Sequence, residues 1–141
     1  MSKGRRIGRL PKWQRNATHL VLAICELSGV VFLLKQSVGL WGGRDGAHDV
    51  LIIHGVSAAF ALMAFGAVLP AHIRISWIAK RNITSGLSML AVMGALMLTG
   101  LLLYYGAEES RDFAELTHEV IGFAAIAVFP LHILIGKFAS G

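Results

Sequence analysis

The sequence predicts an all-α fold, a transmembrane four-helix bundle, and three observations support this class. Of the 141 residues, 55% are hydrophobic and only 15% are charged, whereas soluble domains carry about 25% charged residues. Four separate stretches reach the length of about 20 mostly apolar residues that is needed to cross a bilayer. The basic residues gather at alternate ends of these stretches, as in multi-pass membrane proteins. We expect a basic segment at residues 1–16, followed by one membrane domain at residues 17–141.

The four expected membrane spans cover approximately residues 17–38, 50–71, 84–105 and 117–137. The first span is followed by a turn-rich loop, SVGLWGGRDGAHD, and the second by a basic connection that contains Arg74, Lys80 and Arg81. The third span is followed by an acidic segment, GAEESRDFAE. These short polar connections indicate that consecutive spans cross the membrane in opposite directions.

The distribution of positive charge predicts the orientation of the spans. Six basic residues precede the first apolar run: Lys3, Arg5, Arg6, Arg9, Lys12 and Arg15. Basic flanks favour the cytoplasmic side, so we expect both termini in the cytoplasm. Such a flank on an apolar helix is typical of membrane topology, and no nucleic-acid partner is expected. The first apolar run exceeds the core of a signal peptide, roughly 7–15 residues, so no cleaved leader is expected either.

Two histidine pairs are the most informative polar residues of the apolar spans. The second pair member lies in matching contexts, VLPAHIRI around His72 and VFPLHILI around His132. His118 precedes His132 by 14 residues, about 40° and 21 Å along a helix, and His54 precedes His72 by 18 residues, about 0° and 27 Å. Each pair therefore lies on one face of its helix. An ionisable group within a span indicates a functional site, because lipid does not solvate it.

The alternating spans pair these histidines by depth. The second and fourth spans run in the same direction, so His54 and His118 lie near the outer surface, and His72 and His132 near the inner surface. Two facing imidazoles at each depth would suit two b-type haems. The single cysteine, Cys25, excludes the CxxCH attachment of c-type haem. The spacing of the first pair is four residues longer than that of the second, which leaves His19 as an alternative inner ligand in place of His72.

The chain resembles the small four-helix, membrane-bound di-haem b-type cytochromes of bacteria, which are similar to the cytochrome b subunits of respiratory dehydrogenases. The resemblance covers about residues 50–137 and rests on three stretches: LIIHGVSAAFALMAFGAVLPAHIRI, SGLSMLAVMGALMLTGLLLYYG and LTHEVIGFAAIAVFPLHILIG. It implies a bacterial inner-membrane protein with two bis-histidine haems that exchanges electrons with a quinone pool. The loops leave no room for a dehydrogenase domain, so we expect a non-catalytic electron-transfer subunit, whose redox partner is a separate catalytic or electron-carrier protein.

Three further residues could form a quinone or proton site. Glu26 lies in the middle of the first span, where an ionised carboxylate is costly, and His48 and Asp49 lie just before the second span. Two other classes of function remain open. One is a haem-free transporter whose histidines move protons or bind a metal. The other is a structural membrane anchor whose histidines only pack between helices.

Overall fold

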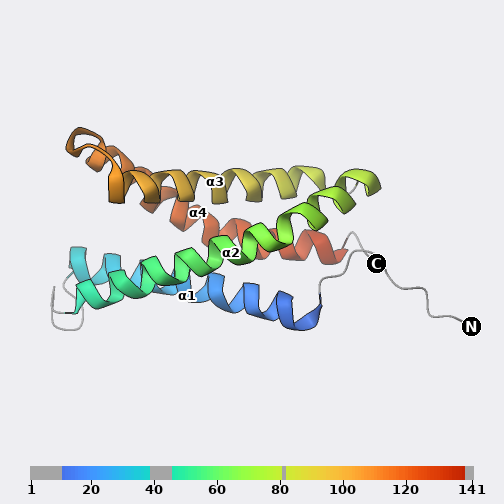
Figure 1. Cartoon of the computed structure of the whole chain (residues 1–141), viewed down its shortest axis with the longest axis horizontal. Coiled ribbons are helices and arrows are strands. Elements are labelled where there is room, and N and C mark those ends of the chain that lie inside the picture. Colours follow the sequence, from blue (N-terminus) through green and yellow to red (C-terminus); the bar gives the residue numbers. More distant parts are fainter. Residues whose placement is uncertain (1–10, 39–45, 81, 139–141) are drawn as a thin grey trace, which may run out of the picture. The chain divides into compact units, whose positions relative to one another are not determined.

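The described part of the chain is helical throughout its regular structure. The computed structural model describes residues 11–38, 46–80 and 82–138, and in them the element order is α1 (Lys12–Val38), α2 (Ala47–Ala79), α3 (Ile83–Tyr105), the short 3₁₀ helix η1 (Glu108–Ser110) and α4 (Arg111–Phe138) (Figure 1). Each of these four α-helices is long and apolar enough to cross a membrane. The all-α prediction with four spans is therefore confirmed. The first ten residues, with four of the six N-terminal basic side chains, and the loop 39–45 lie outside the described residues.

The chain divides into two compact units, which are described separately: residues Met1–Ile75 and residues Ser76–Gly141. The first unit contains α1 and α2 up to Ile75. The second contains the end of α2, then α3, η1 and α4.

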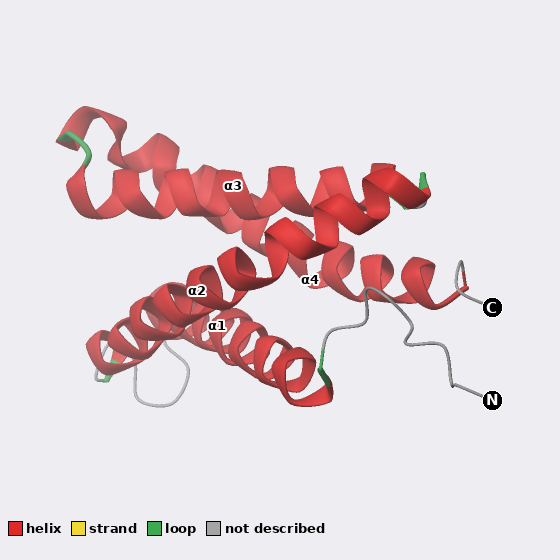
Figure 2. Ribbon diagram, turned by 45° about the vertical axis from the view of Figure 1, so that its right-hand side comes forward, coloured by secondary structure: helices red, strands yellow, loops and turns green. Residues whose placement is uncertain are grey.

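In the first unit, α1 and α2 lie side by side and run in opposite directions (Figures 1 and 2). Small buried side chains permit this close approach, as is common between membrane helices: Ser28 on α1 is 8% exposed, and Ser57 and Ala61 on α2 are 7% and 3% exposed. Gly29 has a direct role in the contact. A Cβ atom at this position would lie only 3.0 Å from Cε1 of His54. The imidazole of His54 therefore occupies the space that a side chain at residue 29 would need.

In the second unit, α3 and α4 form an antiparallel hairpin (Figure 2). Met89 and Met93 of α3, and Ala114 and Ala125 of α4, are nearly inaccessible. The turn before α3 contains Asn82 in the left-handed region, with φ of 57°. At the other end, the N–H of Gly106 donates to the carbonyl of Leu102 at 2.8 Å and closes the last turn of α3.

The helices extend beyond the apolar stretches that predict them. Helix α2 continues through Pro70 as far as Ala79, and α4 begins at Arg111, inside the segment expected to be an acidic loop. Hydropathy detects only the part of a helix that lipid surrounds. The backbone beyond it keeps its internal hydrogen bonds where the chain enters the polar interface. Pro70 and Pro130 both lie inside helices, which membrane helices tolerate when neighbouring groups satisfy the freed carbonyls.

Large aromatic side chains are exposed near the helix ends. Trp13 in the first turn of α1 is 73% exposed, Trp77 in the last turn of α2 is 67% exposed, and Tyr104 and Tyr105 at the end of α3 are exposed as well. Aromatic residues with one polar atom favour the two membrane–water interfaces. Their positions agree with the ends of helices that cross a membrane.

Candidate functional site

His118 of α4 is held by a hydroxyl of the neighbouring helix α3. Oγ1 of Thr99 lies 2.8 Å from Nδ1 of His118. The same hydroxyl donates to the carbonyl of Ala95, 2.8 Å away, and lies 3.2 Å from that of Leu96. A hydroxyl has one hydrogen and two lone pairs, so with its hydrogen given to its own helix it accepts from the imidazole. In that arrangement His118 carries its proton on Nδ1.

His54 of α2 has the same arrangement with α1. Its Nδ1 lies 2.9 Å from the carbonyl oxygen of Cys25. A carbonyl can only accept, so Nδ1 must be the protonated nitrogen. Ser28 supports the contact: its hydroxyl donates to the same Cys25 carbonyl at 3.0 Å, and its Oγ lies 3.4 Å from Nδ1 of His54.

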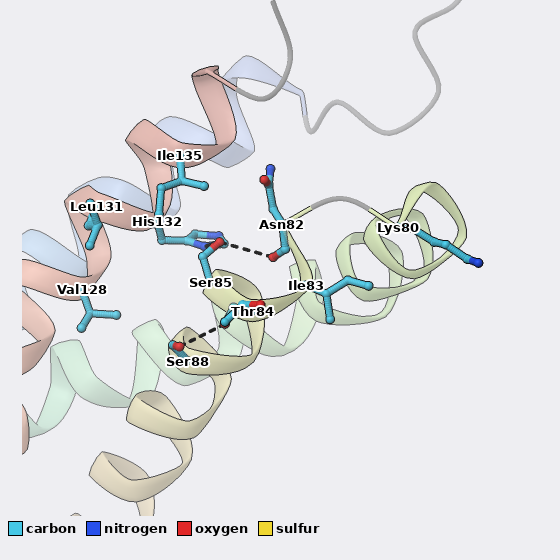
Figure 3. Close-up of a pocket in the computed structure, with 10 residues that line it drawn as sticks. All are labelled: Lys80, Asn82, Ile83, Thr84, Ser85, Ser88, Val128, Leu131, His132 and Ile135. Atoms are coloured by element: carbon cyan, nitrogen blue, oxygen red, sulfur yellow. Dashed lines mark hydrogen bonds between the residues drawn. The ribbon is translucent and has the colours of Figure 1, made fainter.

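His132 of α4 repeats the pattern near the start of α3. Its Nδ1 lies 3.3 Å from Oγ of Ser85, whose hydroxyl donates to the carbonyl of Asn82 at 3.3 Å. The imidazole lies beside a pocket of about 540 Å³, shown in Figure 3. Polar side chains from the start of α3 and the turn before it line one part of this pocket: Lys80, Asn82, Thr84, Ser85 and Ser88. Apolar side chains of α4 line another part: Val128, Leu131 and Ile135.

A hydroxyl residue followed by glycine lies beside each of the three imidazoles, a local sequence that the spacing of the histidines alone does not reveal. These dipeptides are Ser28-Gly29, Ser85-Gly86 and Thr99-Gly100. The glycine lies against the ring in two of the three cases, since a Cβ on Gly100 would lie 3.6 Å from Cε1 of His118 and one on Gly29 would lie closer still to His54. The 14-residue separation of the two dipeptides in α3 equals that of His118 and His132, and this equality was the signal available in the sequence.

The two candidate inner ligands of the first unit lie in different environments. His72 lies on α2, two residues after Pro70, and its side chain is exposed. His19 lies in the second turn of α1 and is half-buried. Both take part in interactions of the chain.

The residues expected at a quinone or proton site lie on the first two helices. Glu26 lies in the middle of α1, directly after Cys25, with a partly exposed side chain. His48 and Asp49 are exposed in the first turn of α2. Within the described part of the chain, no three His, Cys, Asp or Glu side chains gather in a group suited to a metal ion.

Comparison of the chain with protein-family models, with curated proteins and with solved structures gave no match. The site is therefore interpreted from its own chemistry. In three imidazoles of the apolar helices, Nδ1 lies 2.8–3.3 Å from an oxygen of the adjacent helix.

Proposed function

We propose that the protein is a membrane electron-transfer cytochrome b, which binds two b-type haems through histidine pairs and exchanges electrons between a quinone pool and a redox partner protein. The orientation of three imidazoles carries this proposal. The Cys25 carbonyl can only accept, which requires Nδ1–H on His54, and we infer the same form for His118 and His132, whose Nδ1 atoms lie beside hydroxyls. A neutral imidazole with its lone pair on Nε2 is a common metal ligand in proteins.

The partners of these imidazoles also fit haem ligation. A histidine that binds a metal almost always donates its other ring N–H to a carboxylate, a backbone carbonyl or water, which fixes the ring and raises its basicity. The Cys25 carbonyl accepts such a bond, and the Thr99 and Ser85 hydroxyls lie where they can accept one. Haem held by two histidines supplies a one-electron couple with no open coordination position, which suits electron transfer and not substrate activation.

The sequence topology supports a specific pairing. His54 would pair with His118 near the outer surface, and His132 with His72, or with His19 instead, near the inner surface. Both termini would lie on the cytoplasmic side of a bacterial inner membrane. Lipid would surround the exposed apolar faces of the helices. Glu26, His48 and Asp49 would contribute to quinone binding or to the accompanying proton transfer. A separate catalytic or electron-carrier subunit would then complete the reaction.

The decisive experiment is a haem assay on the purified full-length protein, expressed with an adequate supply of haem. We expect two haems b per chain and a reduced-minus-oxidised difference spectrum of the b type. His54→Ala and His118→Ala should each remove one haem. Val120→Ala, a change at an exposed position two residues after His118, should retain both. A chain without haem would end the proposal.

The same assay separates the remaining alternatives. If His72 is the inner ligand, His72→Ala leaves one haem and His19→Ala leaves two, and the reverse result assigns His19. Metal uptake into liposomes by a haem-free preparation would favour a transporter. Intact assembly of a partner complex without any absorption band would favour a structural anchor.

A further inference from the structure

Helix α3 presents two hydroxyls to two imidazoles of α4, at matched intervals. Thr99 contacts His118 and Ser85 contacts His132, and 14 residues separate both the hydroxyl pair and the imidazole pair. Fourteen residues are two heptads. On an α-helix, two residues 14 positions apart differ in direction by only about 40°. Both hydroxyls therefore occupy equivalent positions on α3, and a single packing register brings each one to its imidazole.

We propose that Thr99, and more weakly Ser85, are positioning residues that hold His118 and His132 as Nδ1–H tautomers and so set the basicity of the Nε2 atoms. The effect on a bound haem rests on the proposed function above. The effect on the tautomer does not, because it follows from hydrogen bonds of the protein alone. The two parts can be tested separately.

The position of the Thr99 hydroxyl hydrogen determines the tautomer of His118. That hydrogen has acceptors at 2.8 Å and 3.2 Å on its own helix, the Ala95 and Leu96 carbonyls. Thr99 is only 7% exposed, so water does not readily substitute for the hydroxyl. In the Nδ1–H form the hydroxyl bonds both the ring and the Ala95 carbonyl, whereas in the Nε2–H form it must turn its one hydrogen from that carbonyl to Nδ1. Removing the hydroxyl would therefore cost the Nδ1–H form one hydrogen bond more than the Nε2–H form. The equilibrium between the tautomers would therefore shift toward Nε2–H, which is the form that cannot ligate through Nε2.

The two contacts differ in strength. The distance from Nδ1 to the hydroxyl oxygen is 2.8 Å for Thr99 and 3.3 Å for Ser85. A shorter contact transfers more electron density to the ring, since hydrogen bonds weaken with distance. Thr99 should therefore affect its imidazole more than Ser85 does. A more basic ligand stabilises the oxidised iron more than the reduced iron, so each hydroxyl would lower the reduction potential of the haem beside it.

The first test measures the tautomer in the haem-free, full-length protein in detergent micelles. Histidine is labelled with ¹⁵N, the sample is held at a pH where the imidazoles are neutral, and His118→Asn assigns the resonance. We expect Nδ1–H for the parent chain and for Thr99→Ser, and a shift toward Nε2–H for Thr99→Val. Thr18→Val is the matched control, because the Thr18 hydroxyl makes the same bond to the carbonyl four residues earlier, Gln14, in a different helix.

The second test measures the haem. Changes to groups that hydrogen-bond a metal ligand typically weaken metal binding about 10- to 100-fold. If Thr99→Val weakens the ferric form about tenfold more than the ferrous form, the midpoint potential of the affected haem rises by about 59 mV for one electron. Ser85→Ala should produce a smaller rise, in the other haem. Thr99→Ser should restore the parent potential.

The outcomes are distinct. A His118 tautomer that is unchanged in a helical Thr99→Val protein would overturn the proposal, whether or not the chain binds haem. A changed tautomer with an unchanged potential would overturn its redox part. If the parent chain binds no haem but the tautomer shifts as expected, the function proposed above fails while the positioning role of Thr99 stands.

Discussion

The contact between Gly29 and His54 allows a sharp test of the first unit. In Gly29→Ala, the new Cβ would lie 3.0 Å from Cε1 and 3.2 Å from Nδ1 of His54. Ordinary contacts between such atoms begin near 3.5 Å, so either the ring or the helix must move by several tenths of an ångström. The ring cannot move away from α1 without lengthening its 2.9 Å bond to the Cys25 carbonyl.

The energetic cost of Gly29→Ala follows from the hydrogen bond between Nδ1 of His54 and the Cys25 carbonyl, which the added Cβ would lengthen. Leaving a fully buried donor unsatisfied costs about 1–3 kcal/mol. His54 is half-buried, so we expect the lower end of this range, which corresponds to about a fivefold change in an equilibrium constant. Alanine in a helix interior is itself favourable by about 0.5–1 kcal/mol relative to glycine. The lost hydrogen bond and the helix propensity of alanine therefore have opposite signs. A loss of haem affinity in Gly29→Ala cannot arise from helix propensity.

The assay is a haem titration of the apo-protein, together with the ¹⁵N spectrum of His54. We expect Gly29→Ala to bind the haem at His54 about fivefold more weakly and to broaden or shift the Nδ1–H signal. Gly66→Ala is the control, because a Cβ at Gly66 meets nothing within 4 Å in the structure. Equal haem affinity and identical His54 signals in the two variants would refute the argument that Gly29 makes room for the imidazole.

Two other predictions concern the stability of the second unit. Ala125 is 3% exposed at the packed face of α4, so Ala125→Leu should lower the free energy of unfolding in mixed micelles by about 1–3 kcal/mol. The neighbouring change Ala124→Leu, at an exposed position, should leave it nearly unchanged, and equal effects would contradict the packing described here. Asn82 has a φ of 57°, so Asn82→Val should destabilise the α2–α3 turn by about 1–2 kcal/mol because a β-branched side chain is strained there. Asn82→Gly should be neutral or stabilising in the same unfolding assay, and a more stable valine variant would show that the turn does not need this conformation.

Much of the helical structure could be predicted from the sequence, because lipid leaves helices as the main solution for long apolar runs. The ends could not. Nothing in the composition of ISWIA shows that α2 continues to Ala79, and the charged residues around Arg111 suggest a loop although α4 begins there. At Arg111 the helix begins in a charged segment, and at ISWIA it continues past Arg74, the basic residue at which the expected connection begins.

The candidate site was predictable only in part, for a different reason. A histidine within an apolar span is conspicuous because it is costly in lipid. Ser28, Ser85 and Thr99 are inconspicuous, because small hydroxyl residues are common wherever membrane helices pack. Their role depends on the register between two helices, which no single stretch of sequence contains.

The matched register of α3 and α4 also limits how this hairpin can change in length. Adding or removing one residue between Ser85 and Thr99, or between His118 and His132, would rotate one contact by about 100° relative to the other. No sliding of the helices could then restore both. The turn at residues 106–110 carries no such restriction, because its length does not alter the spacing within either helix. Insertions are therefore best placed in this turn, which makes it the natural position for an epitope or a fluorescent reporter in a chain whose two imidazole contacts must stay intact.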